Sequence, residues 1–227
     1  MSAILNVTKN IYHTVVPRFI RESRLVAKLK GLVGHNIIYD SEYYDHTVEG
    51  PAVRSAGTIS DSIMAEFGPK RVIDVGCGTG ALLEVLREKG CEVCGLEYSN
   101  AALRYCRARQ LDVTKFDIER DLFNDSRTFD VAISTEVAEH LPEKAADRYI
   151  DLLTRLAQII IFTAAPPDQG GRDHVNEQPP SYWISKYRQR GFEHDAELSD
   201  RWKESWKATG SVQDFYYQNV MIFRKSQ

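Results

Sequence analysis

VIDVGCGTGALLEV, residues 72–85, places three glycines within five residues, between an apolar segment and a second apolar run with helical spacing. The first apolar segment predicts a buried strand and the second predicts a helix. A glycine-rich turn between a strand and a helix lets the backbone approach a ligand closely, because no Cβ intervenes and positive φ costs little. The stretch therefore predicts a ligand-binding loop at one edge of an α/β sheet.

Short apolar runs alternate with helix-like segments from residue 71 onward, which is typical of a parallel sheet with helices on both faces. The helix before this region is expected at 51–67, and another through SYWISKYRQR ends at Gly191. Two β-rich stretches near the C-terminus, FEHDAEL and DFYYQNVMIFRK, are expected to add a hairpin-like edge to the sheet. The remaining strands are expected at 71–75, 92–96, 112–116, 129–134 and 158–163, and the remaining helices at 80–90, 99–109 and 143–156.

The glycine loop fits two kinds of nucleotide ligand. Gly76-x-Gly78-x-x-Ala81 satisfies the dinucleotide fingerprint, so a nicotinamide-dependent dehydrogenase is one interpretation. However, Asp74 precedes the loop and Gly80 adds a third glycine. A carboxylate at the mouth of the loop repels a pyrophosphate and attracts a positive ligand. A ligand with an ammonium and a sulfonium group therefore fits better.

Two further acids follow the next two predicted strands. Glu97 lies 21 residues after Gly76, where an acid can accept hydrogen bonds from both ribose hydroxyls. Asp117 ends the third predicted strand, where it can accept from an adenine amine while Ile118 covers the ring. Ligands of open α/β sheets bind at the carboxyl ends of strands, so the sequence predicts an adenosine site along this edge.

The DVGCGTG motif, Glu97, the Phe116-Asp117-Ile118 step and FDVAISTEVAEHLP together resemble the class I S-adenosylmethionine-dependent methyltransferases. The resemblance covers about residues 43–223 and is closest to small-molecule enzymes with the EH motif of ubiquinone biosynthesis. It implies a Rossmann-like, doubly wound, mostly parallel seven-stranded sheet with an antiparallel final strand, plus N-terminal helices. It also implies S-adenosylmethionine as cofactor.

The resemblance implies a role for each residue of the motif. Residues matching Asp74, Gly76, Gly78 and Gly80 surround the methionine part of the cofactor in that family. Those matching Glu97 and Tyr98 hold the ribose, and those matching Asp117 and Ile118 hold the adenine. We count Cys77 and Thr135 among the expected cofactor contacts as well.

The STEVAEHLP segment follows the fourth predicted strand and carries the candidate catalytic residues His140, Glu136 and Glu139. His140 is expected on a short helical turn, with Glu136 on the same face at i,i+4 and Glu139 beside them. Enzymes of this kind that methylate hydroxyls often carry a histidine here, so His140 is the candidate base. A Glu-x-x-Glu-His cluster also binds a divalent metal in some similar enzymes, and Glu136, Glu139, His140 and His174 are the candidate ligands. A purely structural His140 is the third interpretation.

The segment AAPPDQGGRDHVNEQPPSYW, residues 164–183, is too long for a plain connection and is expected to wall the acceptor pocket. No Asn/Asp-Pro-Pro-aromatic tetrapeptide follows the fourth strand, which disfavours amide and nucleobase acceptors. We therefore expect a small-molecule acceptor, a sugar or natural-product hydroxyl, and no nucleic-acid partner. N-methylation of a small amine stays open. The expected substrate contacts are Tyr44, His174, Asn176, Tyr182 and Trp183.

Composition agrees with one globular domain of 227 residues, with 43% hydrophobic and 27% charged residues. Residues 1–48 are expected to form a basic helical arm, and 49–227 the cofactor- and acceptor-binding core. Residues 1–39 contain six Lys/Arg and one acid. Such an arm can contact a membrane surface or a glycan, but it is more often a solvated helix face.

The four cysteines include one close pair, Cys91 and Cys94, inside a predicted strand and without a second pair beside it. A zinc site there is not expected, and reduced thiols with a cytoplasmic location are the default. The sequence does not indicate an oligomeric state. A non-catalytic module that keeps the nucleotide pocket is the third functional class, and the retained EH motif weighs against it.

Overall fold

The computed structural model describes residues 41–125 and 127–226. Residues 1–40 of the expected basic helical arm, which was predicted over residues 1–48, lie outside the described part. The predicted boundary between arm and core, at residues 48 and 49, falls within a continuous helical run. This run consists of α5 (Ser41–Tyr43), the π-helical turn η1 (Tyr44–Val48) and α6 (Glu49–Phe67). No helix in these two described ranges has both the length and the apolarity needed to cross a membrane.

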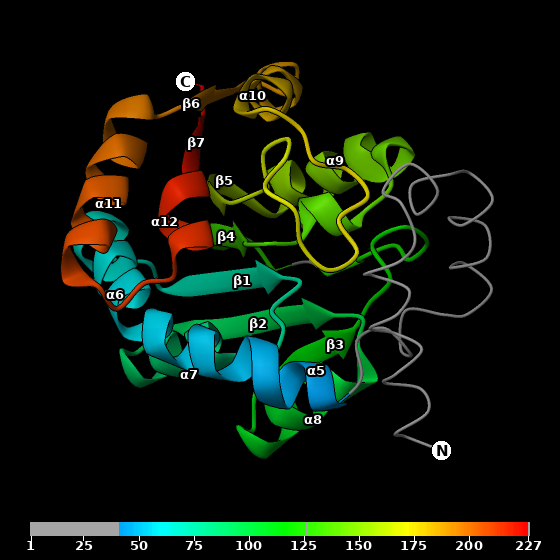
Figure 1. Cartoon of the computed structure of the whole chain (residues 1–227), viewed down its shortest axis with the longest axis vertical. Helices are drawn as coiled ribbons and strands as arrows, with labels where there is room; N and C mark the ends of the chain where they lie inside the picture. Colours follow the sequence, from blue (N-terminus) through cyan, green and yellow to red (C-terminus); the bar gives the residue numbers. More distant parts are fainter. Residues whose placement is uncertain (1–40, 126, 227) are drawn as a thin grey trace. The chain divides into compact units, whose positions relative to one another are not determined.

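A seven-stranded sheet forms the centre of the fold, in the order β3-β2-β1-β4-β5-β7-β6 (Figure 1). The first five strands are parallel, and β7 is antiparallel to both β5 and β6. This confirms the doubly wound sheet with an antiparallel final strand. The strands are β1 (Arg71–Val75), β2 (Glu92–Glu97), β3 (Val113–Lys115), β4 (Phe129–Ser134), β5 (Ala157–Phe162), β6 (Phe192–His194) and β7 (Met221–Lys225).

Helices pack on both faces of the sheet because successive strand residues point to opposite sides. Val72 of β1 belongs to the hydrophobic core of one face, and its neighbour Ile73 belongs to the core of the other. The first core contains apolar residues of α6, α7 (Ala81–Glu88) and α11 (Ala196–Thr209). The second contains residues of α9 (Ala146–Leu156) and α10 (Pro180–Arg188). The parallel strands are thus covered on both sides, as their apolar sequences require.

Helix ends follow local sequence signals. Ser99 caps α8 (Asn100–Ala108), since its hydroxyl accepts hydrogen bonds from the N–H groups of Ala101 and Ala102. Gly68 ends α6 in the left-handed conformation, with φ of +51°. Ser99 thus marks the start of the helix after β2, and Gly68 marks the end of the helix before β1.

The C-terminal region differs from the prediction. Only Phe192–His194 and Met221–Lys225 are strands, so the β assignment of Ala196–Leu198 and of Asp214–Asn219 is wrong. Asp195 explains the first difference, because its side chain accepts from the N–H of Leu198 and caps α11. Asp214–Asn219 form α12, although aromatic residues there suggested a strand. Tyr216 and Tyr217 pack against the core on the α6 and α11 face, and such tertiary packing overrides the β-propensity of aromatic residues.

The two tryptophans of α11 are spaced i,i+4 and therefore lie on the same face of the helix. Trp202 and Trp206 are buried against the α6 face, with ring centroids 5.2 Å apart. The indole N–H of Trp206 donates to the hydroxyl of Ser62 at 2.8 Å. Both rings therefore join α11 to α6 within the core.

Candidate active site

The glycine loop between β1 and α7 has the backbone conformation that its sequence predicts. Gly76, Gly78 and Gly80 adopt φ of +80°, +55° and +78°. A Cβ on Gly76 would lie 2.4 Å from a methyl of Val137, and one on Gly80 would lie 2.5 Å from Leu111. The loop is therefore bare for two reasons, because its left-handed turns and its close neighbours both exclude side chains.

Two buried carboxylates lie at this loop. Glu97 accepts hydrogen bonds from the N–H of Gly78 at 2.9 Å and from the N–H of Ser99 at 2.6 Å. Asp74 is 4% exposed, and its Oδ1 has no hydrogen-bond partner among the described residues. An unpartnered buried carboxylate oxygen is costly unless a cation or a donor reaches it. The loop therefore has the electrostatics of a cation site.

Burial changes the titration of both acids. It raises the pKa of Asp74 to about 8, with a further contribution from the negative charge of Glu97. Burial also raises the pKa of Glu97 to about 7, although the N–H groups of Ser99 and Gly78 partly oppose the shift. A cationic ligand would favour the ionised form of both carboxylates, whereas a phosphate would not.

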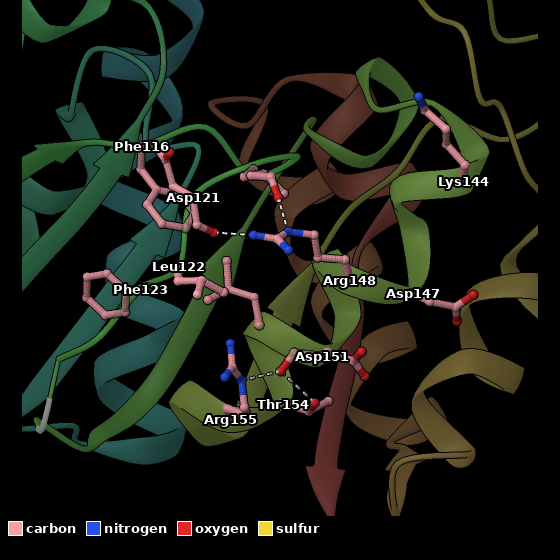
Figure 2. A pocket seen from close by; sticks show the side chains of 12 residues that line it. Phe116, Asp121, Leu122, Phe123, Lys144, Asp147, Arg148, Asp151, Thr154 and Arg155 are labelled. Carbon is pink, nitrogen blue, oxygen red and sulfur yellow. Dashed lines mark hydrogen bonds between the residues drawn. The ribbon is translucent and has the colours of Figure 1, made fainter.

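The adenine end of the predicted site follows β3. The Oδ1 of Asp117 accepts from the N–H of Glu119 at 2.9 Å, and its Oδ2 lies 3.7 Å from Nε of Arg120. Ile118 is half-buried against the core. Beside this segment lies a hollow of about 680 Å³ between the 116–123 segment and α9 (Figure 2). Arg148 of α9 donates from Nε to the carbonyl of Ile118 at 3.0 Å, so α9 anchors the segment.

A second cluster follows β4, where the 3₁₀-helix η2 (Ala138–His140) confirms the short helical turn predicted for His140. Glu139, His140 and His174 offer ligand atoms that all lie within 4.8 Å of one another. Glu139 is fully buried, and neither of its carboxylate oxygens has a hydrogen-bond partner among the described residues. Burial and the charge of Glu136 raise the pKa of Glu139 well above its usual range. The cluster fits a divalent cation.

Glu136 lies outside this cluster of three ligands. Its backbone is left-handed, with φ of +57°, so it precedes the helical turn and does not share a helix face with His140. Its Oε1 accepts from the hydroxyl of Thr163 at 2.8 Å, and its N–H donates to the same hydroxyl at 2.9 Å. Burial raises the pKa of Glu136 to about 7, against the hydrogen bond from Thr163. The structure thus assigns Glu136 a partner that its spacing did not predict.

The long loop after β5 is fixed above the second cluster. The carbonyl of Glu139 accepts hydrogen bonds from the N–H groups of Val175 and Asn176, at 2.8 and 3.1 Å. Glu177 binds Nδ1 of His174 at 3.0 Å through Oε1, and it also accepts from the N–H groups of Asp168 and Gly170. The loop is therefore held by its own acid, which orients the ring of His174 toward His140.

Comparison with known proteins supplies the family. The sequence profile of a family described as "Methyltransferase domain" matches residues 54–166. A ubiquinone biosynthesis O-methyltransferase of Nitrosomonas europaea is 34% identical over 92 residues, which cover 38% of this chain and 39% of that protein. The enzyme of the same name from Hahella chejuensis is 35% identical over 148 residues, 61% of this chain and 56% of that protein. The chain therefore spans 39% of the length of the first relative and 56% of the length of the second.

A solved structure extends the comparison of folds to the whole chain. Magnesium protoporphyrin IX methyltransferase from Synechocystis PCC 6803, solved with bound SAM, superposes with a TM-score of 0.58 at 16% identity. The match covers 98% of this chain and 97% of that one. The chain belongs to the class I S-adenosylmethionine-dependent methyltransferases. The profile match and the sheet topology carry this assignment together.

In this methyltransferase, the expected substrate contacts have different surroundings. Tyr44 is buried, and the charge of Glu97 contributes to raising its pKa, so it lies on the cofactor side. Trp183 is 1% exposed and packs in the core against Phe162 at 5.4 Å. Asn176 is buried, whereas Tyr182 is half-buried under the ammonium group of Lys186. Of these five expected contacts, His174 is the one that belongs to the cluster with Glu139 and His140.

Several residues at the site had no signal in the sequence pattern. Thr163 directly follows β5 and meets Glu136. Asn219 of α12 donates from Nδ2 to Gln169 of the long loop at 2.8 Å, which a predicted strand would not place there. The ring of Tyr43 lies 4.8 Å from the guanidinium carbon of Arg172. Thr163 could have been predicted, because it is a polar residue at the carboxyl end of a strand. The contacts of Asn219, Tyr43 and Arg172 depend on tertiary packing and could not.

The glycine loop provides a direct test of its own geometry. Gly76→Ala is expected to lower the free energy of unfolding by roughly 2–4 kcal/mol, since the new Cβ meets Val137 and the backbone is left-handed. Gly57→Ala is the control, because its Cβ meets nothing within 4 Å and alanine favours α6. Urea unfolding measures both. Equal urea midpoints for Gly76→Ala and the unmodified chain would contradict the loop geometry.

Proposed function

We propose that the chain transfers a methyl group from S-adenosylmethionine to a hydroxyl of a small-molecule acceptor. The observation that carries the proposal is the pairing of two buried acids, Asp74 and Glu97, with a side-chain-free loop. This combination suits a cationic nucleoside and disfavours a diphosphate. The oxygen acceptor is supported by the histidine cluster and by the similarity to O-methyltransferases of ubiquinone biosynthesis.

The residues present fit the cofactor along the whole edge of the sheet. The glycine loop and Asp74 would surround its methionine part, Glu97 would accept from the ribose hydroxyls, and Asp117 would accept from the adenine amine. Each oxygen of Glu97 accepts one backbone hydrogen bond and retains a second lone pair for a hydroxyl. When bound, the cofactor supplies an electrophilic methyl carbon, and the protein aligns it with the acceptor and excludes water.

His140 is the proposed general base for the acceptor hydroxyl. Its Nδ1 lies 3.4 Å from the carbonyl oxygen of Asp173. If Nδ1 carries the hydrogen and donates to that carbonyl, Nε2 is the basic nitrogen that removes the acceptor's proton. The carbonyl of the loop would then favour that tautomer over the other.

Glu139, His140 and His174 also fit a divalent metal ion, and we propose this ion as the alternative in which His140 acts as a ligand and not as a free base. The buried carboxylate of Glu139 lacks hydrogen-bond partners among the described residues, and it would give a metal one oxygen ligand. A metal there would supply Lewis acidity toward the acceptor hydroxyl. Glu136, which is bonded to Thr163, would stay outside the ligand set.

Metal binding has a readout that does not need the acceptor. Adding Mn²⁺ or Zn²⁺ to chelator-treated protein is expected to raise Tm, since a ligand of the folded state stabilises it by mass action. The rise should vanish in Glu139→Gln, and activity should fall after chelation. Glu84→Gln is the matched control, because Glu84 lies on α7, outside this cluster, where it pairs with Arg109. An unchanged Tm with every divalent ion would remove the metal from the proposal.

The proposed reaction is tested with cofactor that carries a deuterated methyl group. Incubation with a cell extract and mass spectrometry should reveal a product heavier by one labelled methyl group. Nuclear magnetic resonance of that product distinguishes an O-methyl from an N-methyl group. An N-methyl product would show that the acceptor group is an amine and not a hydroxyl. The absence of any labelled product would contradict methyl transfer.

A further inference from the structure

Arg172 differs from the other half-buried arginines around the site. Its guanidinium stacks on the ring of Tyr43, with 4.8 Å between the guanidinium carbon and the ring centroid. Within the described part of the chain, no carboxylate lies within 4.0 Å of it and no hydrogen bond satisfies it. By contrast, Arg109 pairs with Glu49 and Glu84 at 2.5 and 2.7 Å. A half-enclosed guanidinium without an anion is an arrangement that an anionic ligand would complete.

The loop holds Arg172 in this position by a constrained backbone. Gly171 and Asp173, its two neighbours, both have positive φ, and a left-handed Asp173 costs free energy. A Cβ on Gly171 would lie 2.2 Å from Nε2 of His174, so only glycine lets that ring pack here. Glu177 clamps the same loop through three hydrogen bonds. The backbone conformation and the hydrogen bonds of this loop therefore fix the position of Arg172.

Arg172 also lies near the proposed reaction centre in the chain. It is two residues from His174, whose ring centroid is 5.0 Å from that of His140. Tyr43, on which it stacks, lies within electrostatic reach of both Glu136 and Glu139, and burial together with these charges raises the pKa of its hydroxyl. Tyr43 thus connects the guanidinium to the acidic cluster. An acceptor whose hydroxyl reaches His140 would have its other end near Arg172.

We propose that Arg172 binds an anionic group, a carboxylate or a phosphate, of the methyl acceptor. The inference rests on the proposed function and narrows its substrate class from any hydroxyl compound to a hydroxy acid or a hydroxyl-bearing phosphate ester. The planar guanidinium can hold either group through two parallel hydrogen bonds, while Tyr43 supports its face. Arg172 is then a specificity-determining residue, and the proton is handled by His140.

The first test examines the labelled product. After incubation of the protein and a cell extract with deuteromethyl-labelled cofactor, the products are separated on an anion exchanger. Labelled product retained by the exchanger supports the proposal, and its loss of retention after phosphatase treatment distinguishes a phosphate from a carboxylate. Labelled product in the neutral flow-through overturns the role of Arg172 but leaves methyl transfer intact. Label in no fraction would contradict methyl transfer itself.

The second test uses the purified acceptor and three variants. Arg172→Gln is expected to raise KM for the acceptor about 10- to 100-fold, as the loss of a charged hydrogen-bonding partner does, with kcat changed much less. Arg172→Lys should recover part of the loss because it keeps the charge. Arg107→Gln, exposed in the last turn of α8, is the control for removing one positive charge. An unchanged KM in Arg172→Gln, or an equal KM change in Arg107→Gln, would overturn the proposal. The affinity for S-adenosylmethionine should stay constant throughout.

Discussion

His140→Ala is expected to slow methyl transfer about 100- to 10,000-fold, which is the range for the loss of a positioned general base. The structure places this ring at 5.0 Å from His174 and beside the carbonyl of Asp173, in the cluster that follows β4. The base acts on the acceptor and not on the cofactor. Affinity for S-adenosylmethionine should therefore change little. Single-turnover kinetics and calorimetric titration of the cofactor measure the two quantities separately.

His46→Ala is the matched control for this variant, since His46 is exposed on η1. It should retain full turnover. Activity of His140→Ala within a factor of a few of the unmodified protein would show that neither proton removal nor metal binding by His140 contributes to the rate. An amine acceptor, which needs no base when it is uncharged, would then be favoured.

Glu97→Ala is expected to weaken S-adenosylmethionine binding about 100-fold or more. The carboxylate is the proposed acceptor for both ribose hydroxyls, and each hydrogen bond to a charged group contributes about 1.5–3 kcal/mol. The same side chain accepts from the N–H groups of Gly78 and Ser99, so its loss also frees the glycine loop. Calorimetric titration with the cofactor measures the effect.

Glu92→Ala provides the control for Glu97→Ala, because Glu92 begins the same strand but is exposed. It should bind the cofactor as the unmodified protein does. Equal affinities for Glu97→Ala and Glu92→Ala would mean that Glu97 has only a structural role in the loop. Far-ultraviolet circular dichroism would show whether Glu97→Ala still folds.

The sequence allowed the sheet and the cofactor edge to be predicted because both depend on local patterns. Apolar runs mark β1, β2 and β4, and the left-handed glycines could be recognised from their spacing alone. The C-terminal part was harder, since α12 contains three consecutive aromatic residues, Phe215–Tyr217, which also suit a strand. Its position depends on long-range packing against the sheet, which no short window contains.

The acceptor side shows the same division between local and tertiary signals. The turn that carries His140 was predicted from its motif, and His174 was expected from a loop 34 residues away. The partner of Glu136 was not predictable, because its left-handed backbone turns it toward Thr163 and breaks the helical spacing. Arg172 and Tyr43 meet only through tertiary structure. A contact between residues far apart in the chain leaves no pattern in a single sequence.

The central claim is that buried acids around the glycine loop bind an adenosyl cation. Folding raises the pKa of Asp74 from 3.8 to about 8 and that of Glu97 from 4.5 to about 7. In the ligand-free protein their contribution to stability is therefore present at low pH and is lost as pH rises through the folded values. A bound cation offsets that loss by stabilising the ionised carboxylates.

Thermal unfolding with S-adenosylmethionine or NADH, at pH 6 and pH 8, tests this claim most directly. S-adenosylmethionine should raise Tm at both pH values, and by more at pH 8, where the two acids would otherwise destabilise the fold. NADH should leave Tm unchanged. A rise with NADH, together with no rise with S-adenosylmethionine, would contradict the account.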